Sequence, residues 1–424
     1  MGNSRKDVQD ELHQEKFQDI QFEKTKEVHH GKLNDIHNEV HREKFQDIQY
    51  KETKEMYHGK LKDIQDEVHH RKLRDIQDEV HDMQDKVLEI NYPTLLQIKN
   101  AIPNRLFRAN TCISMYFFFK DVAIIVGLYI LISYAKSVLP MFLICLLTPV
   151  YWLLQGAVFT GIFVLGHDCG HGSFSRYSLL NDIVGTIVHT VVLTPYYPWK
   201  LSHRNHHKHT GNMDKDEVFY PRRERDHDGK GYMPLFGLGI GWFYYLVKGY
   251  RPRAISHFKM KEAMFSDHTT RCALSLAAMF GWGCCLVYYI QIFGFFSLAY
   301  YYLVPEAIFA SWAVILTFLH HTGENVPWFS DDTWTYVKGQ LSSIDRDYGW
   351  ANSIIHNGGT HQIHHLFPKI PHYHLKEATA YFRNAFPHLA RKRDDPILPS
   401  FLRMFRKFAK NFVASNNASV HIYK

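Results

Sequence analysis

The sequence is poor in the groups that cross-link or clamp a small protein. Its six cysteines are scattered over 424 residues without a C-x-x-C spacing, which excludes a disulfide framework and a thiolate zinc site. The glycine-rich stretch 237–241 has neither a preceding strand nor the spacing of a dinucleotide-binding loop. Long stretches also lack charge, and residues 139–166 contain no Lys, Arg, Asp or Glu. We therefore expect reduced thiols, segments of membrane character and no nucleic-acid partner.

The first 90 residues differ in composition from the rest of the chain. Residues 1–88 carry 16 Lys and Arg against 21 Asp and Glu. Residues 17–44 and 45–72 align without a gap and match at 18 of 28 positions, which indicates an internal duplication. Apolar residues three and four apart, such as Leu61, Ile64 and Val68, predict a helix with one narrow apolar stripe. We interpret 1–90 as a charged, repetitive helical extension and leave open whether it forms a homo-oligomer.

The remaining chain is dominated by apolar runs. A run of 18 helical residues spans about 27 Å, close to the thickness of a bilayer core. The sequence predicts an all-α integral membrane protein with four transmembrane helices arranged as two hairpins, below a cytosolic helical cap. We divide it into a connector at 91–120, a membrane domain at 121–400 and a cytosolic tail at 401–424, with spans at 121–138, 139–166, 272–296 and 299–319.

Lys and Arg predict the orientation of these spans. Residues 167–271, between the two hairpins, carry 15 of them, whereas the hairpin turns have only Lys136. Because positive charge stays on the cytosolic side, we expect this segment and both termini in the cytosol.

Histidine is the unusual residue, with 29 copies. Three clusters stand out, at 167–171, 203–207 and 361–365, and His321 ends the fourth apolar run. Residues three and four apart share one helix face, so each cluster can present its imidazoles to one point. All four segments should reach the same membrane face. The candidate metal ligands are His167, His171, His203, His206, His207, His321, His361, His364 and His365.

Nine imidazoles exceed what a single zinc ion can bind, because zinc takes four ligands. Two metal ions fit the number better. Imidazole suits iron, copper, zinc and nickel, and a two-metal membrane site with open positions favours iron and oxygen chemistry.

The clusters resemble a known family. The segments Gly166-His167-Asp168-Cys169-Gly170-His171, Ser202-His203-Arg204-Asn205-His206-His207 and Thr360-His361-Gln362-Ile363-His364-His365 are similar to the three histidine boxes of the membrane fatty acid desaturases. The resemblance covers about residues 98–400. Within the family, the chain most resembles the methyl-end group, which makes Δ12 and ω3 double bonds. It implies a di-iron centre on the nine histidines. Where many relatives have a further histidine after His321, this chain has Gly323.

The resemblance implies an O2-dependent enzyme that inserts a cis double bond toward the methyl end of an acyl chain, with ω3 favoured over Δ12 by Asp168 and the residues after His171. A dual Δ12/ω3 enzyme and a di-iron acyl hydroxylase remain alternatives. A membrane metal-binding scaffold or transporter is the non-enzyme alternative, for which a charged residue within a span, Glu306, is the feature to examine.

The same resemblance implies two irons, O2, a membrane lipid or acyl-CoA substrate, and residence in the endoplasmic reticulum membrane. Electrons must come from a separate protein, and we expect cytochrome b5 with its NADH-dependent reductase. Carboxylates that could orient the histidines are Asp168, Asp216, Glu217, Asp345 and Asp347. Candidate walls of the acyl tunnel are Trp199, Phe236 and Trp242.

Overall fold

The computed structural model describes residues 39–42, 44, 47–48, 50–72, 82–229 and 236–423, with Phe236 described by its backbone alone. Residue contacts divide the chain into two units, Met1–Asp82 and Met83–Lys424. In the first unit, residues 50–72 form one continuous helix whose side chains are all exposed. This helix coincides with the second copy of the duplication, whereas most of the first copy lies outside the described residues.

The second unit begins earlier than the sequence predicted. A short helix over 82–89 belongs mainly to it, since Met83 and Val87 pack against a cluster formed by Phe329, Val420 and Ile422. The Gln84 side-chain amide also donates a hydrogen bond of 2.7 Å to the Val420 carbonyl. The predicted extension to residue 90 therefore contains a segment that is packed into the second unit.

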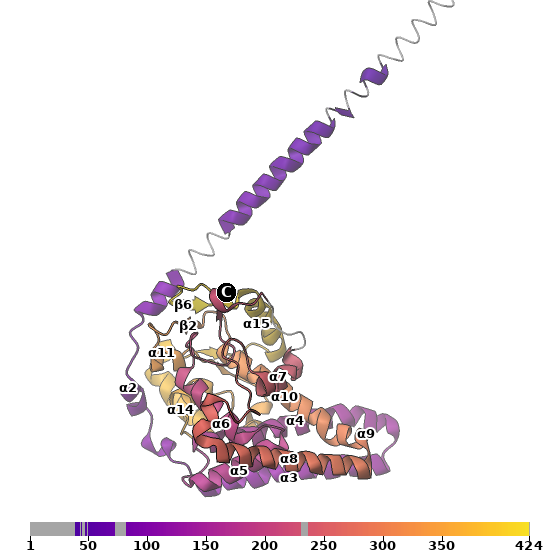
Figure 1. The fold of residues 1–424 in the computed structure, drawn as a ribbon, viewed down its shortest axis with the longest axis vertical. Helices are drawn as coiled ribbons and strands as arrows, with labels where there is room; N and C mark the ends of the chain where they lie inside the picture. Colours follow the sequence, from indigo (N-terminus) through magenta and orange to yellow (C-terminus); the bar gives the residue numbers. More distant parts are fainter. Residues whose placement is uncertain are drawn as a thin grey trace, which may run out of the picture. The chain divides into compact units, whose positions relative to one another are not determined.

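Among the described residues, four helical segments are long and apolar enough to cross a membrane. They are α3 (Thr111–Val138), α4 (Met141–His171), the segment Ala263–Phe293 that contains α8 (Thr269–Phe293), and a broken helix made of α9 (Phe295–Leu298), the π-helical turn Ala299–Leu303 and α10 (Val304–His321). The helices run in two hairpins, as predicted, and project to one side of the unit (Figure 1). The first begins ten residues before the predicted span and so adds Lys120 to it, beside Asp121.

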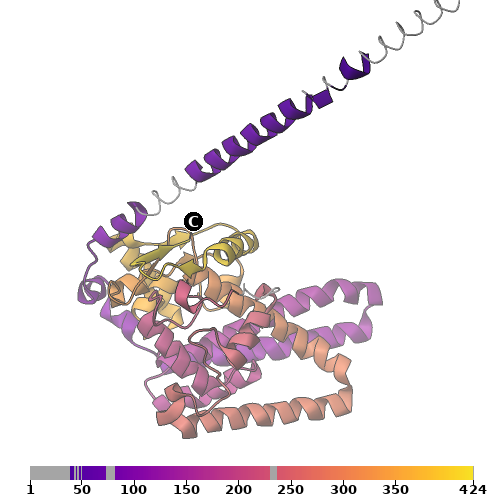
Figure 2. The same cartoon turned by 45° about the horizontal axis from the view of Figure 1, so that its top comes forward.

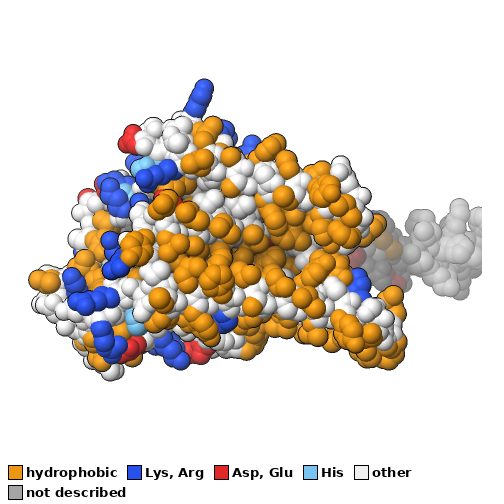
Figure 3. Space-filling view, turned by 90° about the horizontal axis from the view of Figure 1, so that it is seen from below, with side chains coloured by type: hydrophobic (Ala, Val, Ile, Leu, Met, Phe, Trp, Pro, Cys, Tyr) orange, Lys and Arg blue, Asp and Glu red, His pale blue; other side chains and the backbone are white. Residues whose placement is uncertain are grey.

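The four helices form an inner and an outer pair. The apolar windows of α4 and α10 are 44% and 56% buried, whereas those of α3 and α8 are 11% and 6% buried. Gly156 permits the close approach of the inner pair, because a Cβ atom there would lie 2.5 Å from Cγ2 of Ile308. The outer pair presents large apolar side chains such as Leu131 and Phe280, and one face of the unit is broadly apolar (Figure 3). The outer helices are thus suited to contact lipid.

A pair of helices that the sequence did not predict follows α4. Helices α5 (Ser178–Val191) and α6 (Tyr196–His209) are bent by 103° at a short break, and together they pass the same test of length and hydropathy. The exposed side of α5 carries Leu179, Ile183 and Ile187. Part of the segment 167–271, which we expected to lie in the cytosol, therefore lies against the membrane helices.

Short helices and strands form the cap. They are α2 (Leu95–Asn100), α7 (Ile240–Lys248), α11 (Tyr336–Gln340), α12 (Ala351–Ile354), α13 (His361–Leu366), α14 (His372–Ala385) and α15 (Ile397–Asn411), with short 3-10 helices at Asn104–Phe107, Glu224–Asp226, Phe236–Leu238 and Pro387–Leu389. A further 3-10 helix, Ala263–His268, leads into α8. In the described part of the chain, three strand pairs tie the cap together: β1 (Arg222–Arg223) with β5 (Val413–Ala414), β2 (Pro327–Phe329) with β6 (Val420–Ile422), and β3 (Asp345–Arg346) with β4 (Lys392–Arg393).

The C-terminal segment is part of this cap. Helix α15 buries Phe401, Met404 and Phe408, and β6 pairs antiparallel with β2 (Figure 2). The region predicted as a tail from residue 401 is therefore folded.

Candidate metal centre

Four segments bring their histidines together beside the inner helices. His167 and His171 lie in the last turns of α4, and α6 carries the second cluster. His321 ends α10, and the third cluster occupies α13. The structure brings together all nine histidines that the sequence singled out, in two neighbouring groups.

The first group contains His167, His171, His203, His207 and His364, whose nearest ring nitrogens all lie within 4.8 Å of one another. Nε2 of His207 is 3.1 Å from Nε2 of His203 and 3.2 Å from Nε2 of His364. Nε2 of His171 is buried and has no hydrogen-bond partner among the described residues.

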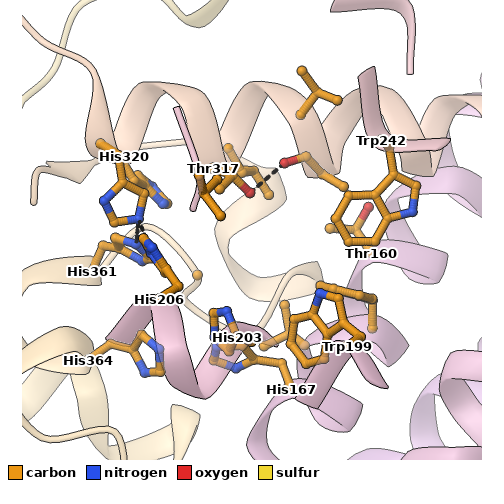
Figure 4. A pocket seen from close by; sticks show the side chains of 18 of the residues that line it. Thr160, His167, Trp199, His203, His206, Trp242, Thr317, His320, His361 and His364 are labelled. Atoms are coloured by element: carbon orange, nitrogen blue, oxygen red, sulfur yellow. Dashed lines mark hydrogen bonds between the residues drawn. The ribbon is translucent and has the colours of Figure 1, made fainter. Parts of the chain in front are cut away.

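The second group contains His206, His321 and His365, again within 4.8 Å, and His361 joins it. Nε2 of His321 lies 3.2 Å from Nε2 of His206 and 3.0 Å from Nε2 of His361. Nε2 of His361 is in turn 2.8 Å from Nε2 of His365. Figure 4 shows imidazoles of both groups converging from different elements.

These distances fit metal ligands. Two nitrogens bound to one metal at about 2.1 Å lie roughly 3.0 Å apart when their bonds are at right angles. Hydrogen bonding alone serves such a cluster poorly, because a neutral imidazole has only one N–H to donate. A set of neutral imidazole nitrogens without a thiolate suits iron, copper, zinc or nickel. The arrangement therefore fits two closely spaced transition-metal ions.

The environment keeps the imidazoles of α13 neutral. Burial, reinforced by the neighbouring imidazoles, lowers the pKa of His361, His364 and His365 well below the ordinary value. Since a metal binds the unprotonated nitrogen, this environment favours ligation at neutral pH.

Three of the five proposed carboxylates lie close to one of the nine histidines, at its ring or at its backbone N–H. Asp216 is fully buried and accepts a hydrogen bond of 2.8 Å from Nδ1 of His206. Asp168 lies 3.6 Å from Nδ1 of His167. Asp345 accepts hydrogen bonds from the backbone N–H groups of His361 and Gln362, at 2.6 and 2.8 Å, and so fixes the start of α13.

The other two carboxylates hold other groups. Asp347 is exposed and accepts hydrogen bonds from the Gly349 N–H and the Asn352 amide. Glu217 is buried and accepts a hydrogen bond of 3.0 Å from the Asn205 amide. Burial raises the pKa of Glu217 to about 8. Neither side chain has a hydrogen bond to a histidine in the described part of the chain.

Several orienting residues escaped sequence reasoning. Nδ1 of His365 lies 3.1 Å from both the Gln340 amide oxygen and the Thr210 hydroxyl. The Tyr348 hydroxyl is 2.9 Å from Nε2 of His320, whose ring stacks on His361. Thr210 is close to the second cluster in sequence, but Gln340 and Tyr348 carry no local signal.

The glycine that replaces a histidine of many relatives is tightly packed. A Cβ atom on Gly323 would lie 2.3 Å from Cδ1 of Ile344. In this chain a larger side chain could enter at that position only if the Ile344 side chain moved.

An apolar cavity leads from both groups. Its walls include Trp199 and Trp242, two of the three candidate tunnel residues, together with Thr160 and Thr317 (Figure 4). The indole of Trp199 stacks on His203, with ring centroids 4.5 Å apart. The Phe236 side chain lies outside the described residues. The cavity can therefore hold an apolar chain against the imidazoles.

Fold and site define a class: a helical membrane protein with two groups of histidines that could hold metal ions, beside an apolar cavity. The fatty acid desaturase family model matches residues 144–395. An sn-1 acyl-lipid omega-3 desaturase (ferredoxin) of Synechocystis is 38% identical over 77% of this chain and 90% of its own. An omega-3 fatty acid desaturase, endoplasmic reticulum, of Nicotiana tabacum is 38% identical over 67% of this chain and 76% of its own. The chain belongs to the fatty acid desaturase family, and it is an oxidoreductase.

Proposed function

We propose that this chain is an iron-dependent ω3 acyl desaturase that inserts a cis double bond toward the methyl end of an unsaturated fatty acyl chain. The observation that carries the proposal is the pair of buried imidazole groups facing an apolar cavity. The names of relatives at 38% identity support the ω3 position. Δ12 or dual Δ12/ω3 desaturation and hydroxylation are the competing outcomes.

Each group of histidines would hold one iron. His167, His171, His203, His207 and His364 would bind the first, and His206, His321, His361 and His365 would bind the second. His361 is assigned to the second group because its Nε2 lies within 3.0 Å of His321 and 2.8 Å of His365. When bound, such iron supplies the oxidising power, drawn from O2, that removes hydrogen from an unactivated methylene.

The residues around the irons position the substrate and exclude water. Trp199 and Trp242 form apolar walls of the cavity beside the imidazoles, and both are buried. Nε1 of Trp242 has no hydrogen-bond partner among the described residues. Because one methylene in an apolar pocket changes binding by only about 1–3 kcal/mol, a few wall residues can shift the position of the double bond.

The electron donor in this proposal is cytochrome b5 with its reductase, and the compartment is the endoplasmic reticulum membrane, with both termini cytosolic. The Nicotiana relative is named as an endoplasmic reticulum enzyme, whereas the Synechocystis relative is named with ferredoxin. Supplying purified iron-loaded enzyme with either donor system distinguishes the two. Faster turnover with ferredoxin would overturn the cytochrome b5 assignment and leave the desaturase assignment intact.

A transporter would need ionisable groups along a path through the spans. Glu306 is buried in α10, and its two carboxylate oxygens have no hydrogen-bond partner among the described residues. It does not line the cavity that contains the histidines. Because Glu306 is separated from the cavity and has no hydrogen-bond partner in the described part of the chain, it supports a structural role in α10 better than a transport path.

The test is the fatty acid profile of yeast that expresses the chain, with and without fed linoleate. Trienes that appear only on feeding are expected for an ω3 enzyme, and dienes from endogenous monoenes would show Δ12 activity. Hydroxylated acids would favour the hydroxylase alternative. Comparing labelled phospholipid with labelled acyl-CoA in microsomes then identifies the form of the substrate.

A further inference from the structure

Among the described residues, three histidines outside the two groups line the cavity: His320, which contacts the Tyr348 hydroxyl, and His356 and His372. His356 and His372 are each 2% exposed. Nε2–H of His356 donates to a carboxylate oxygen of Asp121 at 2.5 Å. Nδ1–H of His372 donates to a carboxylate oxygen of Asp168 at 3.0 Å. Both imidazoles are therefore held by a buried carboxylate, as imidazoles that move protons often are.

His372 has one nitrogen left open. Since Asp168 accepts the hydrogen bond from Nδ1, a neutral His372 ring carries no proton on Nε2. This Nε2 atom is buried, and it has no hydrogen-bond partner among the described residues. The backbone N–H of His372 also donates to Asp168, at 3.1 Å, which fixes the ring at the start of α14. The open nitrogen can take up a proton and pass it to a molecule in the cavity.

A series of protonatable groups leads from this ring toward the surface. The rings of His372 and His356 lie 4.6 Å apart, and the Phe117 ring packs edge-on against both. On the other side of His356, Asp121 is 3.3 Å from Nζ of Lys120, whose side chain is 29% exposed. The groups thus run from a partly exposed amine to a buried ring in the cavity wall.

The fold holds His356 in an uncommon backbone conformation. His356 and the next residue, Asn357, have φ angles of 53° and 57°, in the left-handed region that few residues other than glycine adopt, although His and Asn do so more readily than most. The segment reaches between α3 and α4 only because residue 161 is glycine, since a Cβ atom there would lie 2.5 Å from the Ile354 carbonyl oxygen. Strain of this kind is often associated with functional sites.

We propose that His372, supplied through His356, delivers the protons that desaturation consumes. The inference rests on the proposed function. In that reaction two methylene carbons lose two hydrogens, which combine with O2, two electrons from the donor protein and two protons from solvent to give two waters. For each proton, protonated His372 releases the hydrogen on Nε2 to oxygen and returns to the neutral ring, while its Nδ1–H stays on the ring and remains donated to Asp168. The neutral ring then receives the next proton from the side of His356.

The test compares His372→Gln and His372→Ala in the full-length, iron-loaded protein. The Gln amide can still donate to Asp168 but carries no exchangeable charge. We expect turnover to fall by about 100-fold in both variants, within the usual range for loss of a proton-transfer group. Iron content and melting temperature of the Gln variant should match the parent. Both variants should release more of the consumed O2 as hydrogen peroxide than the parent. Added imidazole should raise the turnover of the Ala variant by at least about tenfold.

His374→Gln is the matched control, because His374 lies in the same helix and does not line the cavity. Full turnover in His372→Gln would overturn the inference. So would a variant that retains iron and loses turnover, but neither releases more peroxide nor is rescued by imidazole. If the Ala variant does not fold, His356→Gln supplies the second comparison, with an expected smaller loss and the same rise in peroxide. A parent protein that makes no desaturated product would instead refute the proposed function.

Discussion

The two histidine groups are held in place by different means. In the second group, Nδ1 of His206 is hydrogen-bonded to Asp216, and Nδ1 of His365 contacts Gln340. In the first group, Nδ1 of His167, His207 and His364 is buried without a hydrogen-bond partner in the described part of the chain.

Packing takes the place of hydrogen bonds in the first group. Trp199 stacks on His203, and His207 stacks on His365 at 4.1 Å. A hydrogen bond at Nδ1 fixes which nitrogen faces the metal, whereas packing fixes only the plane of the ring. The second group is therefore preorganised by polar contacts, and the first should depend more on the metal itself.

The largest effect should follow the loss of a ligand from the group held by packing. We expect His364→Ala to lower the iron content from about two per chain to about one and to reduce desaturation by more than about 100-fold, because the paired site is broken. Iron is measured in the purified protein and products are measured by gas chromatography. His388→Ala, at an exposed position, is the control. Two irons retained in the His364 variant would contradict the ligand assignment.

The polar contact on the second group should matter less than a ligand but still strongly. Asp216→Asn keeps the size of the side chain and weakens the acceptor for His206. Loss of such an outer contact typically costs about 10- to 100-fold in metal affinity or activity. Iron affinity is measured by competition with a chelator. Asp347→Asn, which removes an exposed carboxylate with no histidine contact, should leave affinity unchanged, and an equal effect of the two substitutions would refute the distinction.

Removing the stacking contact of the first group should have a smaller effect. An aromatic stack contributes about 0.5–1.5 kcal/mol, so Trp199→Leu should weaken iron binding by roughly 2- to 10-fold. Trp350→Leu, at a residue that is 61% exposed, serves as the control. If Trp199→Leu instead costs as much as Asp216→Asn in the same chelator competition, the two groups do not differ as described.

The smallest effect should come from the N-terminal unit. Residues 1–82 form a separate unit by their contacts, and the family match begins at residue 144. We expect a chain starting at residue 83 to keep iron content, melting temperature and turnover within about twofold of the parent, since no site residue is removed. Sedimentation of both chains then tests whether the extension promotes self-association. Loss of iron on truncation would show that the extension supports the centre.

Sequence spacing was enough to single out the nine histidines that the structure brings together and to predict the main helices. His167 and His171 are four residues apart and therefore lie on the same face of a helix. Long runs without charged residues indicate helices that lie in a membrane or in a protein core. The predicted tunnel residues Trp199 and Trp242 also line the cavity. The bent pair α5–α6 escaped prediction because α5, with 14 residues, is too short to span a bilayer by itself, and α6 carries the polar second histidine cluster.

The carboxylates illustrate the limit of sequence reasoning. Five were proposed from proximity along the chain, yet Asp347 faces solvent while Asp216 is fully buried against His206. Asp121 is the first residue of the predicted span 121–138, and its partner His356 lies 235 residues away.

The sequence by itself determined the type of protein, because helical periodicity, hydropathy and histidine spacing are patterns among residues that lie close together in the chain. Only the tertiary structure decided how the nine histidines divide into two groups, which of them are held by Asp216 and Gln340, and that His372 lines their cavity with an open nitrogen. Those contacts join α4, α6, α10, α13 and α14, whose side chains meet only after the helices have packed. Orientation of a ring nitrogen depends on a partner distant in sequence, and no local pattern encodes it.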